Sequence, residues 1–86
     1  QDLRDPERAV QLAEQACKLT NFGDPEFLAT LGIVYAMVGR HTEAITVSQK
    51  AVVVARRAGR EEFARRVERD FQAYWREHLG PAKPPR

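Results

Sequence analysis

The residues with reactive or metal-binding side chains are few: two histidines, one cysteine and a group of carboxylates near the C-terminus. His41 and His78 have no cysteine, aspartate or histidine at the spacing of a metal site, so surface histidines are the simpler interpretation. Cys17 has no histidine near it in the sequence to serve as a base. It falls on an apolar helical stripe, which favours a small core residue.

Four carboxylates could be considered as an acid–base set: Glu61, Glu62, Glu68 and Asp70. They are interleaved at helical spacing with five arginines: Arg57, Arg60, Arg65, Arg66 and Arg69. Opposite charges three or four residues apart pair on a helix surface, so ion pairs explain this pattern more simply. The sequence has no Gly-rich phosphate loop and no nucleophile elbow. We therefore predict no catalytic residue, no metal ligand and no cofactor, and we expect that the chain is not an enzyme.

The arginines also raise the question of nucleic-acid binding. The segment from Arg56 to Glu77 holds seven arginines against five acids, and the whole chain carries a formal charge of only +2. A surface that follows a phosphate backbone needs a clearer positive excess on one face. We predict no nucleic-acid partner.

Length and composition limit the remaining classes. With 86 residues, 43% of them hydrophobic and 30% charged, the chain is typical of one small globular domain. No apolar run approaches the ~20 residues of a membrane helix, so we predict no membrane segment in a soluble chain. Because the chain begins at Gln1 without a methionine, we expect it to be a fragment of a longer protein. One cysteine leaves the compartment open, with the cytoplasm as the default.

The first predicted helix covers residues 6–20. Asp5 can cap it, Pro6 suits its first position and Glu7 suits its positive end. Apolar residues recur at helical spacing along it: Ala9, Val10, Ala13, Ala16, Cys17 and Leu19. We expect Gly23 to take a positive φ angle where this helix ends.

The second helix begins with the same signal, Asp24-Pro25-Glu26. One of its faces carries Leu28, Leu31, Gly32, Tyr35 and Val38. Glycine inside a helix costs ~1 kcal/mol relative to alanine, so Gly32 indicates close packing against another helix. Gly39 ends this helix, and the short loop after it makes the next helix antiparallel.

The third helix is expected from Thr42 or Glu43 to just before Gly59. One edge carries Ala44, Ser48, Ala51 and Ala55, and the other carries Ile45 and Val52. The fourth is expected from Arg60 to His78, with this apolar stripe: Phe63, Val67, Phe71, Tyr74 and Trp75. Gly80-Pro81 stops it, and residues 81–86 are predicted to be a flexible, basic, proline-rich tail.

The second and third helices resemble one tetratricopeptide repeat (TPR), whose pattern is W-x2-L-G-x2-Y, then A-x3-F, then P. The matching positions are Leu31, Gly32, Tyr35, Gly39, Ala44 and Ala51. Leu28, Ser48 and Arg56 replace the usual tryptophan, aromatic and proline. The resemblance implies an all-α, antiparallel helix–turn–helix stack, the C-terminal end of a TPR array. Residues 1–80 would form one domain, with a leftover helix at 6–20, one complete repeat at 25–58 and a capping helix at 60–79.

In TPR proteins the first helix of each repeat lines a concave groove that binds peptides or helices. Carried over by position, the groove side here is Glu26, Ala29, Thr30, Ile33, Ala36 and Met37. The Lys and Asn of the carboxylate clamp would fall at Ala29 and Ile33, so recognition of a C-terminal carboxylate is not expected. The alternative is that these residues pack on a neighbouring helix of the parent protein.

The resemblance therefore predicts a non-catalytic protein–protein interaction module whose partner is another protein or a peptide. Two alternatives remain. The chain could be a structural end-cap or self-association segment, forming a homodimer through its first helix. It could also be an accessory domain, because similar arrays occur at the C-terminus of large bacterial proteins, some of them glycosyltransferase-like.

Overall fold

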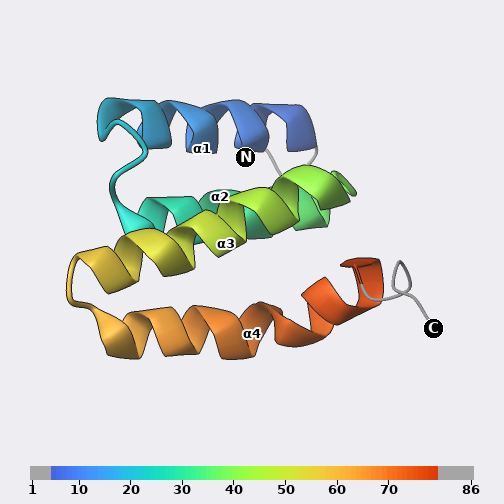
Figure 1. Ribbon diagram of the computed structural model, residues 1–86. Helices are drawn as coiled ribbons and strands as arrows, with labels where there is room; N and C mark the ends of the chain where they lie inside the picture. The colour runs from blue at the N-terminus through green and yellow to red at the C-terminus, as the bar shows by residue number, and fades with distance from the viewer. Residues whose placement is uncertain (1–4, 80–86) are drawn as a thin grey trace.

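The computed structural model describes residues 5–79 and contains four α-helices in that range. They are α1 (Pro6–Leu19), α2 (Pro25–Met37), α3 (His41–Arg57) and α4 (Glu61–Leu79). Each helix packs on the next one along the chain, and successive helices run in opposite directions (Figure 1). The predicted all-α helical stack is therefore confirmed. The predicted tail at residues 81–86 lies outside the described residues.

Aspartate and proline together start the first two helices, as expected. The Asp5 carboxylate accepts a hydrogen bond from the Arg8 backbone N–H at 3.2 Å. The Asp24 carboxylate accepts from two backbone N–H groups, those of Glu26 at 2.9 Å and Phe27 at 3.3 Å. These side chains satisfy N–H groups that have no partner within the helix.

Three helices end in the same hydrogen-bonded turn, a Schellman motif, in which the residue after the C-cap takes a left-handed conformation. Gly39 and Gly59 take it after α2 and α3, with φ of 84° and 78°. After α1 the prediction for Gly23 is wrong, because the positive φ angles belong to Asn21 (59°) and Phe22 (57°). Asparagine tolerates this conformation better than most residues, so the α1 turn closes before the glycine is reached.

Gly59 allows a test of this ending, because a Cβ placed on it would meet no atom within 4 Å. Replacing Gly59 with alanine should therefore cost only the left-handed backbone strain, about 1 kcal/mol in the free energy of unfolding. Gly59→Asn should cost less, since asparagine visits this conformation more readily. Urea denaturation followed by circular dichroism measures both, and equal stability of all three chains would contradict the assigned turn.

The predicted helix boundaries and buried stripe of α1 need small corrections. The third helix begins at His41 rather than at Thr42 or Glu43, and the fourth covers Glu61–Leu79 rather than Arg60–His78. On α1, Val10 and Cys17 are buried, whereas Ala9 is exposed and the Leu19 side chain is 85% exposed. The buried face of α1 is narrower than its apolar pattern because α2 is its main packing partner among the described helices.

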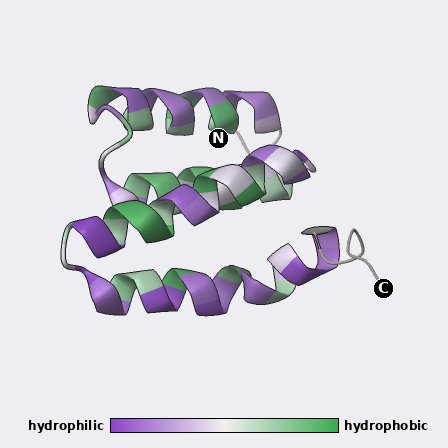
Figure 2. Cartoon of the chain, viewed as in Figure 1, coloured by the Kyte–Doolittle hydropathy of each residue, from purple (hydrophilic) through white to green (hydrophobic). Residues whose placement is uncertain are grey.

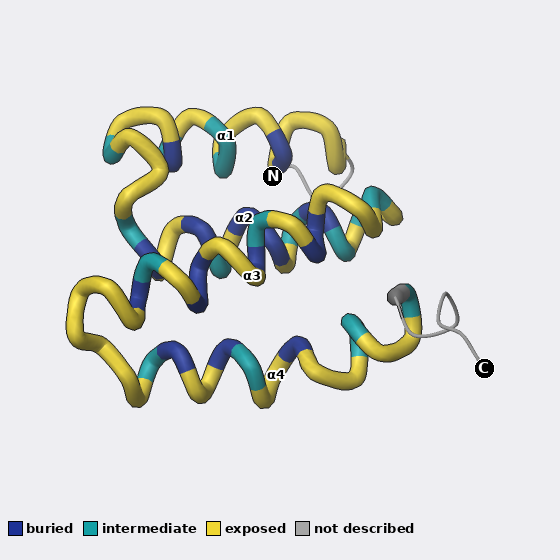
Figure 3. The backbone as a smooth tube through the Cα atoms, in the orientation of Figure 1, coloured by how far each residue is buried: buried dark blue, intermediate teal, exposed yellow. Residues whose placement is uncertain are grey.

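The core lies between α2 and its neighbours, where the predicted fold-determining residues meet. Buried there are Leu28, Leu31, Gly32, Tyr35, Ala44 and Ala51. Apolar residues concentrate on α2, and burial is greatest along α2 and α3 (Figures 2 and 3). A Cβ on Gly32 would lie 3.3 Å from the Ser48 Cβ and 3.4 Å from a ring carbon of Phe71. Gly32 thus allows α2 to approach both α3 and α4.

The fourth helix buries one face against α3 and exposes the other. Ala64, Val67 and Phe71 are buried, and Trp75 is half-buried. The Trp75 Nε1–H donates a hydrogen bond of 2.8 Å to the Ser48 hydroxyl, which itself donates to the Ala44 carbonyl at 2.7 Å. Ser48, at the position where a TPR usually has an aromatic residue, thus receives an aromatic side chain from α4.

Candidate functional site

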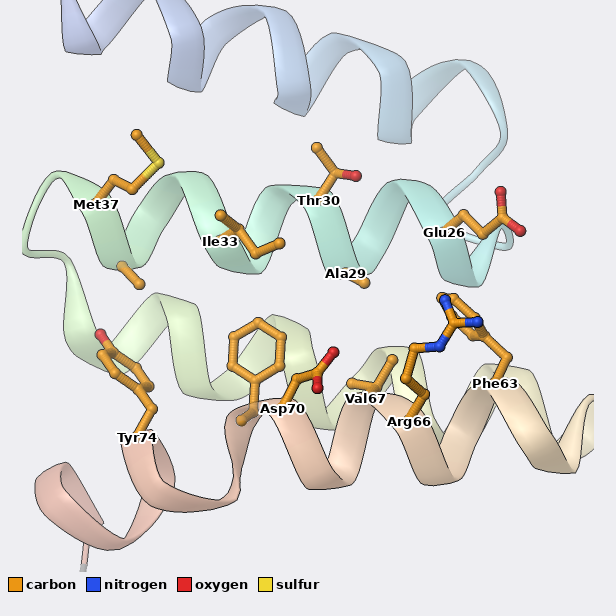
Figure 4. Close-up of a pocket in the computed structure, with 12 residues that line it drawn as sticks. Glu26, Ala29, Thr30, Ile33, Met37, Phe63, Arg66, Val67, Asp70 and Tyr74 are labelled. Carbon is orange, nitrogen blue, oxygen red and sulfur yellow. The ribbon is translucent and has the colours of Figure 1, made fainter.

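A cleft of about 540 Å³ runs between α2 and α4. All six residues that the TPR resemblance places on a groove line its α2 wall: Glu26, Ala29, Thr30, Ile33, Ala36 and Met37. The opposite wall comes from α4 and consists of Phe63, Arg66, Val67, Asp70, Phe71 and Tyr74 (Figure 4). The cleft is therefore formed by two helices that face each other across it.

The α2 wall is apolar because this helix is apolar on both sides. Its buried side meets α1 and α3, while Ile33 and Met37 line the cleft and remain 50% and 76% exposed. Ala29 and Ala36 add little bulk, so the wall is low between the larger side chains. An exposed isoleucine and methionine one helical turn apart form a surface that a partner can desolvate.

The α4 wall contributes the aromatic part of the site, which the sequence interpretation did not include. Four residues of this wall belong to the predicted apolar stripe of α4: Phe63, Val67, Phe71 and Tyr74. Part of this stripe packs in the core, and part of it borders the cleft. Val67 and Phe71 are buried, whereas Phe63 and Tyr74 are only half-buried and border the cleft. The sequence did contain a signal for this second wall. The apolar stripe on α4 is wider than α3 alone can cover.

Charged groups lie at one end of the cleft and along its α4 edge. Glu26 and Arg60 form an ion pair of 2.7 Å, and the Arg60 guanidinium lies 4.9 Å from the centre of the Phe63 ring. Arg66 and Asp70 project from α4 along the same wall (Figure 4). These groups surround an apolar centre with polar positions that can select a ligand's orientation.

At the other end of the cleft, Tyr74 contacts His41 and His78, which were expected to be surface residues. The His41 and His78 rings stack with centroids 3.9 Å apart and an interplanar angle of 16°. The His41 Nδ1 and the Tyr74 hydroxyl are hydrogen-bonded at 2.5 Å. His41 is 33 positions from Tyr74 and 37 from His78, so helical spacing gives no sign that it contacts them.

The remaining candidates for chemistry have the environments of structural groups. Hydrogen bonds from Arg56 lower the pKa of Glu61 and Glu68, opposite to the change that a general acid needs. Of the predicted kind of ion pair, four residues apart on one helix, the structure shows Arg65 at 3.5 Å from Glu61. The shorter pairs connect two helices: Arg56 of α3 lies 3.1 Å from Glu61 and 2.9 Å from Glu68 of α4. Cys17 is fully buried, and burial raises the pKa of its thiol, which keeps it protonated and weakly nucleophilic.

Residues 5–79 contain no group of three or more histidine, cysteine, aspartate or glutamate side chains placed to hold a metal ion. None of the helices described here has both the length and the apolar character needed to cross a bilayer.

Comparisons of the chain with models of known protein families, with curated proteins and with solved structures found no match. The TPR resemblance therefore rests on the sequence pattern itself, and the function must be argued from the cleft.

Proposed function

We propose that the chain is a non-catalytic protein-interaction module that binds a polypeptide segment in the cleft between α2 and α4. The observation that carries this proposal is the pairing of exposed apolar residues on α2, above all Ile33 and Met37, with half-buried aromatic rings on α4. Two facing apolar walls favour a ligand that inserts side chains between them.

The dimensions of the cleft indicate a short ligand segment. The α2 wall extends from Glu26 to Met37, which is ~17 Å at 1.5 Å per residue. An extended peptide of about five residues covers that length. Affinity would come from desolvation of Ile33, Met37 and Phe63, and orientation from the Glu26–Arg60 pair and from Asp70.

The TPR resemblance supports the same role, because the six groove positions it implies all lie on this cleft. The residues at the carboxylate-clamp positions are Ala29 and Ile33, neither of which can bind a C-terminal carboxylate as Lys and Asn do. We therefore expect an internal peptide segment with apolar side chains rather than a chain terminus.

Phage display of random 12-residue peptides tests the proposal, with selection on the intact chain at neutral pH. Ile33→Asp places a charge in the centre of the cleft and should weaken the selected peptides about tenfold or more. Val53→Asp is the matched control, because Val53 is 48% exposed, close to the 50% of Ile33, and lies on α3 outside the cleft. Affinities are measured by fluorescence anisotropy with a labelled peptide.

Two outcomes would contradict the proposal: a selection that enriches no peptide, or enriched peptides that bind Ile33→Asp and Val53→Asp equally well. The first removes the binding activity, and the second moves it away from the cleft. Circular dichroism of both variants separates lost binding from lost folding.

Self-association through α1 is the second candidate, and one observation favours it. Leu12 and Leu19, two helical turns apart on α1, are 55% and 85% exposed. A second copy or a preceding segment of a longer protein could cover them. Light scattering at high micromolar concentration separates the two candidates, since a monomer there would count against self-association.

An accessory role beside a catalytic domain stays a third proposal that the sequence of a longer parent would test.

A further inference from the structure

A hollow with polar walls adjoins the cleft where α4 begins. Three residues line both of them: Glu26 of α2, and Phe63 and Arg66 of α4. Because these walls are shared, the hollow and the cleft are continuous, and one ligand can occupy both. The other charged residues that line the hollow are Arg60, Glu61, Glu62, Arg65 and Arg69. Charged groups therefore lie directly beside the apolar walls of the cleft.

We propose that the peptide bound in the cleft is acidic at one end, and that its carboxylate binds Arg66 and Arg69 while its apolar side chains contact Ile33 and Met37. The inference rests on the proposed function, because it names the class of peptide that the same cleft selects. It adds a charge requirement and an orientation to a binding surface described so far by its apolar walls.

The four arginines of the hollow differ in whether a carboxylate already binds them. Two are paired across short distances: Arg60 with Glu26 at 2.7 Å, and Arg65 with Glu61 at 3.5 Å. None of the ion pairs formed within residues 5–78 includes Arg66 or Arg69, and both of these side chains are exposed on α4. An incoming carboxylate can therefore bind them without breaking an ion pair of the free protein.

The spacing of Arg66 and Arg69 favours an anion between them. Residues three apart on a helix are neighbours on its surface, and two like charges there repel each other. A bound carboxylate would reduce this repulsion. The guanidinium group also presents paired N–H donors that match the two oxygens of a carboxylate. The two arginines together therefore favour an acidic side chain over a neutral one.

The acidic residues nearby limit how much negative charge this surface accepts. The hollow is lined by four arginines and three glutamates, which is an excess of one positive charge. Such an excess suits one acidic side chain of a peptide. It does not suit a nucleic acid, whose backbone carries a negative charge at every phosphate.

Asp70 determines which end of the cleft receives the acid. It lines the cleft but not the hollow, and it follows Arg66 on α4 by one helical turn, ~6 Å along the axis. Arg66 lies at the Glu26 end of the cleft, and Asp70 lies closer to the Met37 end (Figure 4). A ligand carboxylate is attracted at the first position and repelled at the second. We therefore expect the acid at the Glu26 end and apolar side chains towards Met37.

The same geometry sets the spacing within the ligand. Arg66 and Tyr74 are eight residues apart on α4, which is ~12 Å along the helix axis. An extended peptide advances ~3.3 Å per residue, so its acidic residue would lie about three to four positions from the apolar residue beside Tyr74.

The phage selection on the intact chain gives the first test. The enriched peptides should share an aspartate or glutamate about three to four positions from a large apolar residue. Peptides without an acidic residue that still lose affinity for Ile33→Asp would overturn this inference and leave the proposed function standing. A selection that enriches no peptide would overturn the proposed function and this inference with it.

The second test pairs changes in the peptide with changes in the protein. Replacing the acidic residue of a labelled peptide with its amide should weaken binding about three- to fivefold in fluorescence anisotropy, and Arg66→Gln or Arg69→Gln should have a similar effect on the acidic peptide. With Arg66→Gln, the amide peptide should bind about as well as the acidic one, because the two changes remove the same contact.

Arg76→Gln is the matched control. Arg76 is exposed on the same helix and lines neither the cleft nor the hollow, so the variant loses the same charge away from the site. It should bind the acidic peptide as the parent chain does, and circular dichroism checks that all variants stay folded. Equal losses with Arg66→Gln and Arg76→Gln would overturn the inference, since net charge alone would then explain the effect.

A labelled single-stranded oligonucleotide of 12 nucleotides is the last probe. It should bind at least about tenfold more weakly than the acidic peptide at physiological salt, because one excess charge cannot neutralise a row of phosphates. Binding as tight as that of the peptide, and lost with Arg66→Gln, would assign the arginines to nucleic acid and overturn the inference.

Discussion

Replacing Phe71 with alanine is expected to lower the free energy of unfolding by about 3–5 kcal/mol. The Phe71 side chain is only 7% exposed and lies between Gly32 of α2 and the rings of Tyr74 and Trp75 on its own helix. Its removal leaves a cavity where three helices meet. A domain of 86 residues has a total stability of roughly 4–13 kcal/mol, so this one change removes a large part of it.

Phe27→Ala is the matched control for this prediction. Phe27 lies on α2 and is 40% exposed, so the same deletion of a ring should cost less than about 1 kcal/mol there. Urea denaturation followed by circular dichroism compares the two variants. The single tryptophan, Trp75, adds a local signal, since its emission should shift to longer wavelength when α4 leaves Ser48. Similar stability of the two variants would mean that α4 does not pack against Gly32 as described.

Replacing Gly32 with leucine is expected to cost about 1–3 kcal/mol through overpacking, with a larger loss if α4 is displaced. A single Cβ at this position already comes within 3.3 Å of Ser48, 3.4 Å of Phe71 and 3.5 Å of the Ala44 carbonyl oxygen. The rest of a leucine side chain has no space unless the helices separate. For a domain of this size, each kcal/mol lowers the melting temperature by about 4–8 °C.

Gly32→Ala and Thr30→Leu control for this result. Alanine adds one tight contact but gains about 1 kcal/mol in helix propensity, so its net effect should be small. Thr30 is exposed on the same helix, and leucine there should leave the melting temperature nearly unchanged. A thermal melt of Gly32→Leu that equals that of Thr30→Leu would show that α2, α3 and α4 do not meet at Gly32.

Half of the candidate site could be predicted from the sequence. The α2 wall was predicted through the TPR resemblance, which Leu31, Gly32 and Tyr35 carry and which implies a groove along the first helix of the repeat. The α4 wall could not be predicted in the same way. Whether Phe63 and Tyr74 are fully buried on α3 or reach the cleft depends on how α4 crosses α3, and that crossing is set by Ser48 and Gly32 on other helices.

The sequence by itself determined the four helices, their antiparallel order and the buried faces of α2 and α3. Those features depend on local interactions: an aspartate cap, a glycine that tolerates positive φ, and apolar residues that recur every three or four positions. The tertiary structure alone decided that Asn21 rather than Gly23 closes α1, and that His41 stacks on His78. Contacts of this second kind depend on the register and crossing of whole helices, which a periodic pattern in one segment cannot specify.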